Sequence, residues 1–437
     1  MSGARELLHD LYGAAVGGAN VESLTASALA SVPLKRRERV WVFAFGKAAQ
    51  GMASAAVTAL QRSLAEIPGG LVVAPEPAEA PFGTVSAIVG DHPVPSRRSF
   101  LAAARINDVI TAKRGADTGI VLISGGASSL IGAPLRGMSE ADFTQLYTLL
   151  FGSGLDIQSM NAIRKRLSLW GAGRMALRLA PAPTYCFAIS DVPGDDLATI
   201  GSGPCVPDPT RVHEVIEALQ RSGLYAQIAP AFQRYLSDVA RGVTPETPKA
   251  THPAFAHVTA RVIANNTVAL KAAATAARNS GCHAVIQEQP LVGDAAAAGA
   301  RVAETLLRSR ETVAPGQMHA FIWGGETTVS LNGSTPAGGR CQELALAASK
   351  YLANAGERAA GITLLAAGTD GRDGPTDAAG AVVDASTWTA ILNNGRDPEA
   401  ALRAHESYDA LARANALFAP GTTGTNVMDI TIGLVRA

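Results

Sequence analysis

ITLLAAGTDGRDGPTD, residues 362–377, joins an apolar run to a loop that holds three aspartates and three glycines. The apolar run predicts a buried strand, and the loop begins where this strand ends. Ligands of α/β proteins bind outside the carboxyl ends of the strands. Glycines there let backbone amides approach an anion closely, and aspartates can hold a hard cation such as Mg²⁺. A single loop of this kind is also typical of a solvated turn, so its interpretation depends on whether the pattern recurs.

The pattern recurs along the chain as short apolar runs, each followed by a glycine-bearing turn and then by a helical pattern. This alternation predicts an α/β fold in which parallel sheets are covered by helices on both faces. The strands expected in a first sheet are residues 40–45, 71–74, 86–89, 120–123 and 184–189. The strands expected in a second sheet are residues 262–264, 284–287, 320–323, 327–331 and 362–367.

A polar stretch with three prolines, residues 237–253, lies between the two sets of strands. We interpret this stretch as a linker, because prolines among polar residues interrupt both helices and strands. The domain boundary is therefore expected near residue 245. The predicted domains are residues 1–245 and residues 246–437.

The charges of the chain balance, with 37 Lys plus Arg against 37 Asp plus Glu in 437 residues. Without a net basic field, neither nucleic acid nor an acidic membrane is an expected partner, which leaves small molecules. The four cysteines stand far apart without a C-x-x-C pair, which argues against a disulfide scaffold and a zinc site. This cysteine usage fits a reduced, cytoplasmic compartment. Charges interrupt residues 1–20, and no uncharged apolar run reaches about 18 residues, so neither a signal peptide nor a membrane helix is expected.

Polar residues follow several predicted strands of the first half. Lys47 comes directly after strand 40–45 at a strand-to-helix turn, where it could reach a phosphate beside helix N-terminal amides. This is not a P-loop, because no glycine stands five positions before Gly46 and position 48 is alanine. Asp91 and His92 follow another strand and precede two prolines. They could face a substrate or form a rigid turn, and the turn is slightly favoured.

Two further strand ends of the first half carry candidate binding residues. Residues 124–129 hold two glycines among three serines, which predicts an anion-binding nest of backbone amides and hydroxyls. Asp191 stands at the end of strand 184–189, so it is a candidate metal ligand or base. Asp195 and Asp196 could instead cap the start of the next helix. The candidate binding residues of the nest are Ser124, Gly125, Gly126, Ser128 and Ser129.

In the second half, Arg340 follows two glycines at a predicted helix start. There its guanidinium can hold a carboxylate or a phosphate with paired donors. Other polar segments of this half are typical both of phosphate-binding loops and of ordinary turns. Their candidate binding residues are Asn265, Gly324, Gly325 and Glu326, and the candidate metal ligands of the opening loop are Asp370 and Asp373.

Two familiar signatures are excluded by their context. Residues 171–176, GAGRMA, match the dinucleotide fingerprint G-x-G-x-x-A. The fingerprint needs a preceding buried strand, whereas residues 161–170 carry three consecutive basic residues in a helical pattern. The hypothesis that the chain is a dehydrogenase therefore loses its main support. The opening loop is not an EF-hand, because its aspartates are three and four positions apart and no glutamate closes the loop.

Taken together, the motifs resemble those of the class II glycerate 2-kinases, whose C-terminal part is called the MOFRL domain. The resemblance covers nearly the whole chain, and members of the family have often been labelled hydroxypyruvate reductases. The motifs that carry it are AFGKAA at 44–49, GDHP at 90–93, ISGGAS at 123–128, ISDVPGD at 189–195, GSGP at 201–204, GGET at 324–327, GGRCQE at 338–343 and GTDGRDG at 368–374.

The resemblance implies a Rossmann-like N-terminal domain and a smaller α/β domain, with the MOFRL region at about 319–430 and the active site in the cleft between the domains. It implies transfer of a phosphoryl group from Mg-ATP to the 2-hydroxyl of D-glycerate, with Lys47 and Arg340 as catalytic residues. Phosphoryl transfer needs mainly positioning and charge neutralisation. On this hypothesis the 124–129 nest holds the glycerate carboxylate or the ATP phosphates. Asp191, with Asp370 or Asp373, then holds Mg²⁺ or accepts the hydroxyl proton.

Two alternatives from other function classes stay open at this stage. One is an NAD(P)H-dependent hydroxypyruvate reductase, which the failed fingerprint disfavours. The other is a non-catalytic protein that binds a nucleotide or a sugar acid, which the presence of both Lys47 and Arg340 disfavours. The expected partners are D-glycerate and ATP, and assembly into a homo-oligomer is left open.

Overall fold

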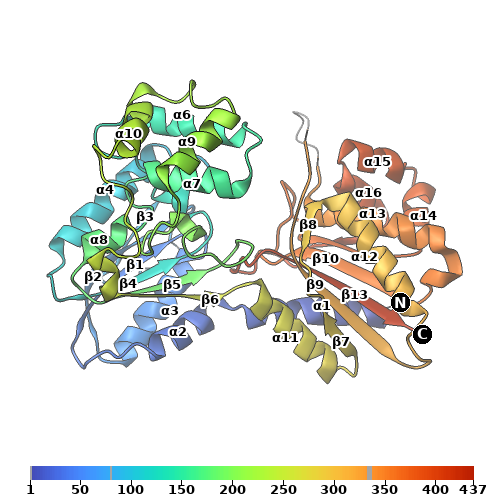
Figure 1. The fold of residues 1–437 in the computed structure, drawn as a ribbon. Coiled ribbons are helices and arrows are strands. Elements are labelled where there is room, and N and C mark those ends of the chain that lie inside the picture. The colour runs from blue at the N-terminus through green and yellow to red at the C-terminus, as the bar shows by residue number, and fades with distance from the viewer. Residues whose placement is uncertain (1, 79–80, 332–336) are drawn as a thin grey trace. The chain divides into compact units, whose positions relative to one another are not determined.

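The computed structural model describes residues 2–78, 81–331 and 337–437, and it divides the chain into two compact units. One unit is Val21–Ile263, and the other joins the N-terminal residues up to Asn20 to Ala264–Ala437 (Figure 1). The division after residue 263 differs from the boundary expected near residue 245. It also assigns the N-terminal helix to the C-terminal unit, which nothing in the sequence pattern indicated.

The unit Val21–Ile263 is built on a six-stranded sheet in the order β3-β2-β1-β4-β5-β6. Its strands are β1 (Arg39–Phe45), β2 (Glu66–Ala74), β3 (Ser86–Val89), β4 (Thr118–Ile123), β5 (Thr184–Ile189) and β6 (Val258–Ala264). The β1/β2, β1/β4, β2/β3 and β4/β5 pairs are parallel. This is the doubly wound order, whose switch point for ligands lies between β1 and β4. All five strands expected in this sheet are confirmed.

The sixth strand, β6, corrects one expectation. Residues 262–264 belong to it, and they extend the first sheet beside β5 instead of starting the second sheet. Its residues alternate between exposed and partly buried up to Arg261, as in a strand with one covered face. Its partly buried apolar residues pack on the same core as the central strands. The chain therefore leaves this sheet about one strand later than the proline-rich stretch suggested.

Helices cover both faces of this sheet (Figure 1). Alternate residues of β1 point to one face, where Trp41, Phe43 and Phe45 join the core of α4 and α8. A separate helical layer has its own apolar core around Phe143, Tyr147 and Phe232. The flanking elements are α2 (Val21–Ala30), α3 (Ala49–Arg62), α4 (Arg97–Ala112), α5 (Ala127–Leu130), α8 (Arg174–Leu179), η1 (Ile200–Ser202) and η2 (Pro253–His257), and the separate layer is α6 (Glu140–Phe151), α7 (Ile157–Leu167), α9 (Val212–Arg221) and α10 (Pro230–Ala240).

The second unit is built on a sheet in the order β12-β11-β10-β13-β9-β7, with β8 also paired to β9. Its strands are β7 (His283–Ile286), β8 (Leu291–Asp294), β9 (Met318–Thr328), β10 (Ile362–Gly368), β11 (Gly380–Asp384), β12 (Leu417–Phe418) and β13 (Asp429–Arg436). The expectation of a purely parallel sheet is wrong here. Only β7/β9 and β8/β9 are parallel among the recorded pairs, and β9, β10, β11, β12 and β13 pair antiparallel.

Two strands expected at 320–323 and 327–331 form the single strand β9, which ends at Thr328. The sequence suggested a break at Gly324 and Gly325, but both glycines lie within the strand and pair with Ile430 and Asp429 of β13. The opening stretch behaves as expected at its start, since residues 362–367 lie within β10, between β11 and β13. Glycines thus mark close packing in β9 and a loop after β10.

The N-terminal helix α1 (Ser2–Gly18) belongs to this unit because it packs along α11. The Tyr12 hydroxyl also donates a 2.8 Å hydrogen bond to the carbonyl of Gly368 at the end of β10. Helices lie on both faces of the sheet, as in the first unit (Figure 1). They are α11 (Asn266–Asn279), α12 (Ala295–Arg310), α13 (Arg340–Ala355), η3 (Gly356–Ala359), α14 (Thr387–Asn393), α15 (Pro398–Ala404) and α16 (Ser407–Arg413). Within the described ranges, none of the helices has the length and apolarity that crossing a bilayer requires.

Candidate functional site

Lys47 lies at the switch point of the first sheet, directly after β1 and Gly46. Its amide donates a 2.9 Å hydrogen bond to the carbonyl of Gly125, and the next amide, of Ala48, donates to Ser124 Oγ at 3.0 Å. The loops that follow β1 and β4 are therefore joined by two hydrogen bonds. Because both strands are parallel neighbours, their carboxyl ends meet at one edge of the sheet.

Close approach between these loops depends on glycine. A Cβ atom added to Gly46, where φ is +126°, would lie 2.2 Å from Ser124 Oγ. A Cβ atom added to Gly125 would lie 1.9 Å from Asp191 Oδ2, so the Asp191 carboxylate contacts the loop after β4. Lys47, the 124–126 segment and Asp191 thus come from the ends of β1, β4 and β5 and gather at one edge of the sheet.

The electrostatics of this edge are set by partial burial and by the charge of Lys47. Burial raises the pKa of Asp191 above its usual range, while the nearby Lys47 ammonium acts in the opposite direction. Burial, and then the same ammonium, lower the pKa of His92 to about 4. His92 is therefore neutral at pH 7, and Asp191 holds a proton more readily than an ordinary aspartate. Both are properties of groups that can exchange protons with a substrate.

For the Asp91-His92 segment the sequence left open a rigid turn or a role facing the substrate, and each residue fits one of the two. Asp91 forms the turn, because its carboxylate accepts hydrogen bonds from the Ser96 hydroxyl and from the amide and guanidinium of Arg98. His92 instead faces the candidate site, since a Cβ atom on Gly126 would lie 3.0 Å from its ring carbon Cδ2 and 3.5 Å from Lys47 Cγ. Sequence reasoning noted His92 but did not place it among the site residues.

In the 124–129 loop, backbone amides are available to bind an anion, whereas the hydroxyls of Ser128 and Ser129 already form hydrogen bonds within the protein. Within the described part of the chain, the amides of Gly125, Gly126 and Ser128 donate to no acceptor, so they are available to an anion. Ser129 Oγ donates back to the carbonyl of Gly126 at 3.1 Å, and Ser128 Oγ lies 2.7 Å from Ser202 Oγ. The two serine side chains therefore stabilise the loop and its neighbour after β5.

Asp196 does not cap the next helix as expected, because η1 has Thr199 at its N-cap and no side-chain cap; Asp196 holds the turn before it. Its carboxylate accepts hydrogen bonds from the amide of Ala198 and from the hydroxyl of Thr199. These bonds hold the turn that precedes η1, in the way that a side-chain oxygen satisfies free amides at a helix start. Asp196 is therefore occupied locally, which leaves Asp191 as the carboxylate that contacts the loop after β4.

Arg340 is the first residue of α13 in the second unit, and two carboxylates hold its guanidinium. Its Nε and Nη2 donate to the two oxygens of Asp429 at 2.6 and 2.8 Å, and its Nη1 lies 2.9 Å from Glu326 Oε1. Burial disfavours its charge, but the hydrogen bonds and charge of Asp429 outweigh burial and raise its pKa. The guanidinium is thus fixed as a cation beside two carboxylates.

The carboxylate of Asp373 caps α13, and its two oxygens accept the amides of Cys341 and Gln342 at 3.2 and 2.8 Å. It is 3% exposed, and burial raises its pKa to about 6 against the effect of these amides. Asp370 is more open, and one of its oxygens accepts the amide of Arg372 at 3.0 Å. Among the described residues, no group of three or more His, Cys, Asp and Glu side chains is arranged to hold a metal.

The remaining sequence candidates of this unit have local roles. A Cβ atom on Gly324 would lie 1.6 Å from Asn266 Oδ1, and one on Gly325, where φ is +126°, would lie 2.3 Å from the carbonyl of Leu291. Both glycines therefore allow close packing around β9. Asn265 caps α11 by accepting the amide of Val268 at 3.0 Å. Of this set, only Glu326 contacts a predicted catalytic residue, Arg340.

Sequence reasoning missed Asp429, the residue that fixes Arg340. The signal was weak, because a single aspartate before an alternating apolar strand is also an ordinary strand start. It also missed the pair formed by Glu343 and His405, whose Oε2 and Nδ1 atoms lie 2.8 Å apart beside α13. Glu343 is 2% exposed, and burial raises its pKa. Such partners are brought together by the fold and do not share a motif.

Comparison with known proteins agrees with this geometry. The family model described as a domain of unknown function (DUF4147) matches residues 7–237, and the MOFRL family model matches residues 319–429. The D-glycerate 2-kinase of Thermotoga maritima is 36% identical over 93% of each chain. A relative from Agrobacterium vitis, named only provisionally as a hydroxypyruvate reductase, is 36% identical over 99% of this chain and 94% of its own.

Structural comparison leads to the same group of proteins. The crystal structure of glycerate kinase from Thermotoga maritima matches with a TM-score of 0.87 and 33% identity, covering 100% of both chains. One family model spans more than half of this chain, and the relatives cover nearly all of it. The chain therefore belongs to the glycerate 2-kinase family, in which a DUF4147 domain precedes a MOFRL region.

Proposed function

We propose that this protein phosphorylates D-glycerate at its 2-hydroxyl with ATP, giving 2-phospho-D-glycerate and ADP. The observation that carries the proposal is the grouping of Lys47, Asp191 and the free amides of residues 125, 126 and 128 at the switch point of the first sheet. Phosphoryl transfer needs cations and amides that neutralise the phosphoryl oxygens, together with a group that takes the hydroxyl proton. The names of the relatives support the same substrates.

The roles of the residues follow from their chemistry. Lys47 and the free amides bind anionic oxygens of glycerate or ATP, and Arg340 supplies a second, fixed cation. Asp191 accepts the proton of the 2-hydroxyl as its oxygen attacks the terminal phosphorus, and ADP leaves with the electron pair of the broken P–O bond. The raised pKa of Asp191 suits this role, because a base whose pKa lies nearer to the working pH accepts a proton more readily.

Magnesium is expected to arrive with ATP, and the carboxylates differ in how well they suit it. Asp373 is a poor ligand, because both of its oxygens already accept helix amides. Asp370 has one oxygen that accepts a single amide, and Asp191 is placed beside the anion-binding loop. We therefore propose Asp370 as a ligand of the ion, while Asp191 keeps the role of base. The bound ion supplies positive charge to the phosphate oxygens.

A cytoplasmic location is part of the same proposal, because ATP is available there and all four cysteines of the chain are free thiols. The reductase alternative has less support. Gly171 and Gly173, the glycines of the apparent fingerprint, follow the helix α7 instead of a strand. The fingerprint therefore lacks the strand that must precede it.

The decisive experiment offers the purified chain two substrate pairs. D-Glycerate with Mg-ATP is expected to release ADP, and hydroxypyruvate with NADH is expected to leave the NADH absorbance unchanged. Coupling the kinase product to enolase without a mutase should consume it at once, because enolase acts on 2-phosphoglycerate and not on the 3-isomer. No ADP release, or a product that enolase leaves untouched, would contradict the proposal.

A further inference from the structure

A pocket of about 540 Å³ lies in the unit Val21–Ile263, between α10, the loop 135–138 and the segment 244–248. Arg174, from the apparent dinucleotide fingerprint, forms part of its wall. Pockets that hold small molecules typically have volumes of about 300–1,000 Å³ and combine apolar walls with a few polar groups. The lining residues used below are Arg136, Met138, Arg234, Tyr235, Asp238 and Pro245.

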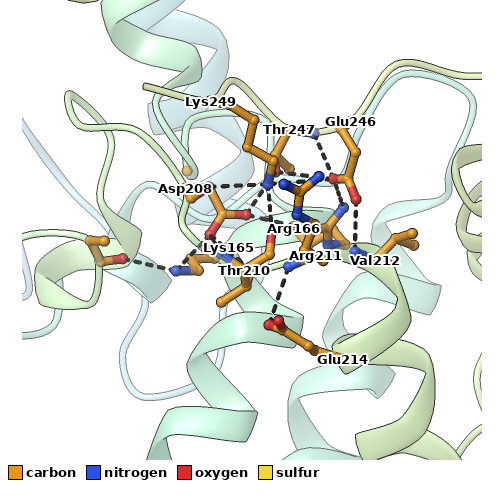
Figure 2. A network of polar contacts seen from close by, with 12 residues as sticks. Lys165, Arg166, Asp208, Thr210, Arg211, Val212, Glu214, Glu246, Thr247 and Lys249 are labelled. Carbon is orange, nitrogen blue, oxygen red and sulfur yellow. Dashed lines mark hydrogen bonds and ion pairs between the residues drawn. The ribbon is translucent and has the colours of Figure 1, made fainter. Parts of the chain in front are cut away.

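One wall of the pocket is held by a buried network of ion pairs (Figure 2). Asp208 accepts the Lys165 ammonium and the Thr247 hydroxyl, each at 2.8 Å. Glu246 accepts the Arg166 guanidinium at 2.6 Å and the amide of Val212 at 2.8 Å. These contacts tie the segment 244–248 to α7 and to the start of α9. The wall is therefore preformed, so a ligand would not have to order it first.

The carboxylates of the pocket are already neutralised. Asp238 pairs with Arg241 at 2.6 Å, and Glu246 pairs with Arg166 and Lys249. By contrast, no described residue forms a hydrogen bond or ion pair with the guanidinium of either Arg136 or Arg234. Two cations without counter-ions thus line the same pocket. Each guanidinium presents N–H donors in the planar fork that binds phosphate and carboxylate oxygens.

The third arginine of the pocket, Arg174, directs its Nη1 and Nη2 donors at groups of the protein. The Arg174 guanidinium donates to the carbonyls of Lys165, Arg166, Ser168 and Gly171 and to the Tyr235 hydroxyl. Burial lowers its pKa, as expected for a cation with too little negative charge around it. The Tyr235 hydroxyl accepts this bond at 3.2 Å, and its own hydrogen stays available to a ligand.

We propose that this pocket binds a small organic phosphate, with the phosphate between Arg136 and Arg234 and an apolar body along Met138 and Pro245. The site lies on α10 and its neighbours, whereas Lys47 and the 124–129 loop follow β1 and β4. None of Lys47, residues 124–129 and Asp191 lines the pocket, so it is a second binding site. Binding there does not depend on glycerate phosphorylation.

Phenyl phosphate tests the proposal, because it joins one phosphate to an apolar ring of suitable size. Calorimetric titration of the full chain should show saturable binding of phenyl phosphate but not of phenol, which has the ring without the charge. Arg136→Ala and Arg234→Ala should each weaken binding at least tenfold. The matched control is Arg221→Ala, which removes an exposed arginine of α9 outside the pocket and should leave binding unchanged.

Two further measurements separate the pocket from the kinase site. Lys47→Ala should bind phenyl phosphate as the unaltered protein does, and the two pocket variants should phosphorylate D-glycerate at the normal rate. Both arginines are exposed and unpaired, so their removal should leave the thermal midpoint unchanged. Absence of saturable binding, unchanged affinity in both Arg136→Ala and Arg234→Ala, or loss of binding on Lys47→Ala alone would each overturn the proposal.

Discussion

At the scale of single residues, two cations carry the proposed chemistry. Lys47→Ala and Arg340→Ala should each lower kcat for glycerate phosphorylation by about 10³-fold, because each removes charge that neutralises the phosphoryl oxygens in the transition state. Steady-state kinetics with D-glycerate and Mg-ATP measures the effect. Lys35→Ala, which removes an exposed lysine, is the matched control. Turnover within tenfold of normal in either variant would remove that residue from the catalytic set.

Asp429 is a positioning residue, because it holds Arg340 through two short hydrogen bonds. Asp429→Asn keeps the shape of the side chain but leaves only one oxygen to accept, so the guanidinium gains freedom. We expect kcat to fall about tenfold to 100-fold, with a smaller change in the KM for glycerate. The comparison is Asp409→Asn, which breaks an exposed ion pair with Arg413. A kcat within twofold of normal would show that Asp429 does not act through Arg340.

The residues that sequence reasoning brought together were those at the ends of neighbouring parallel strands. Lys47, the 124–129 loop and Asp191 follow β1, β4 and β5, and parallel strands end at one edge of a sheet. Asp429 could not be found in this way, because it begins β13, an antiparallel strand, and contacts Arg340 on the helix α13. Residue patterns do not reveal which strands far apart in the chain will pair.

At the scale of elements, the start of α13 depends on a buried carboxylate. Burial raises the pKa of Asp373 to about 6 from the ordinary aspartate value near 3.8. Between these values the folded protein keeps a proton that the unfolded chain has lost. The free energy of unfolding should therefore fall as the pH rises from about 4 to about 6, and the contribution of Asp373 should be constant above that range.

Asp373→Asn tests this dependence, since asparagine does not titrate. Urea unfolding at several pH values should show that the difference in unfolding free energy between the variant and the unaltered protein changes between about pH 4 and 6. Asn also keeps one acceptor for the helix amides, so it should cost about 1 kcal/mol relative to the protonated acid. The control is Asp377→Asn, which alters an exposed carboxylate of the same loop. A difference that is constant with pH would contradict the raised pKa.

Elements were predicted best where a strand lies in the middle of the parallel sheet. There both faces are buried, so the strands appear as continuous apolar runs such as residues 40–45 and 120–123. β6 was assigned to the wrong sheet, because strand order depends on tertiary packing and not on local pattern. β9 was divided in two, because the glycines that allow Asn266 and Leu291 to pack closely look like turn residues in a sequence.

At the scale of the whole molecule, the contacts of α1 are the least foreseeable feature. The helix begins the chain, yet it packs on α11 and reaches β10 through Tyr12, in a unit whose other residues start at Ala264. The Thr425 hydroxyl also donates to the carbonyl of Ala19 at 3.0 Å. Residues up to Asn20 are therefore part of the packing of the unit that contains Ala264–Ala437.

Removal of residues 1–20 should therefore destabilise the C-terminal unit and spare the unit Val21–Ile263. The deletion exposes the face of α11 that α1 covers and removes the bond from Tyr12 to Gly368, which contributes about 1 kcal/mol by itself. Hydrogen exchange with mass spectrometry should show faster exchange in α11 and β10 but unchanged exchange in β1 and β4. A milder variant, Tyr12→Phe, should accelerate exchange near Gly368 while Tyr351→Phe, at an exposed position, should not. If deletion instead accelerated exchange in β1 and left α11 protected, α1 would have to stabilise the other unit.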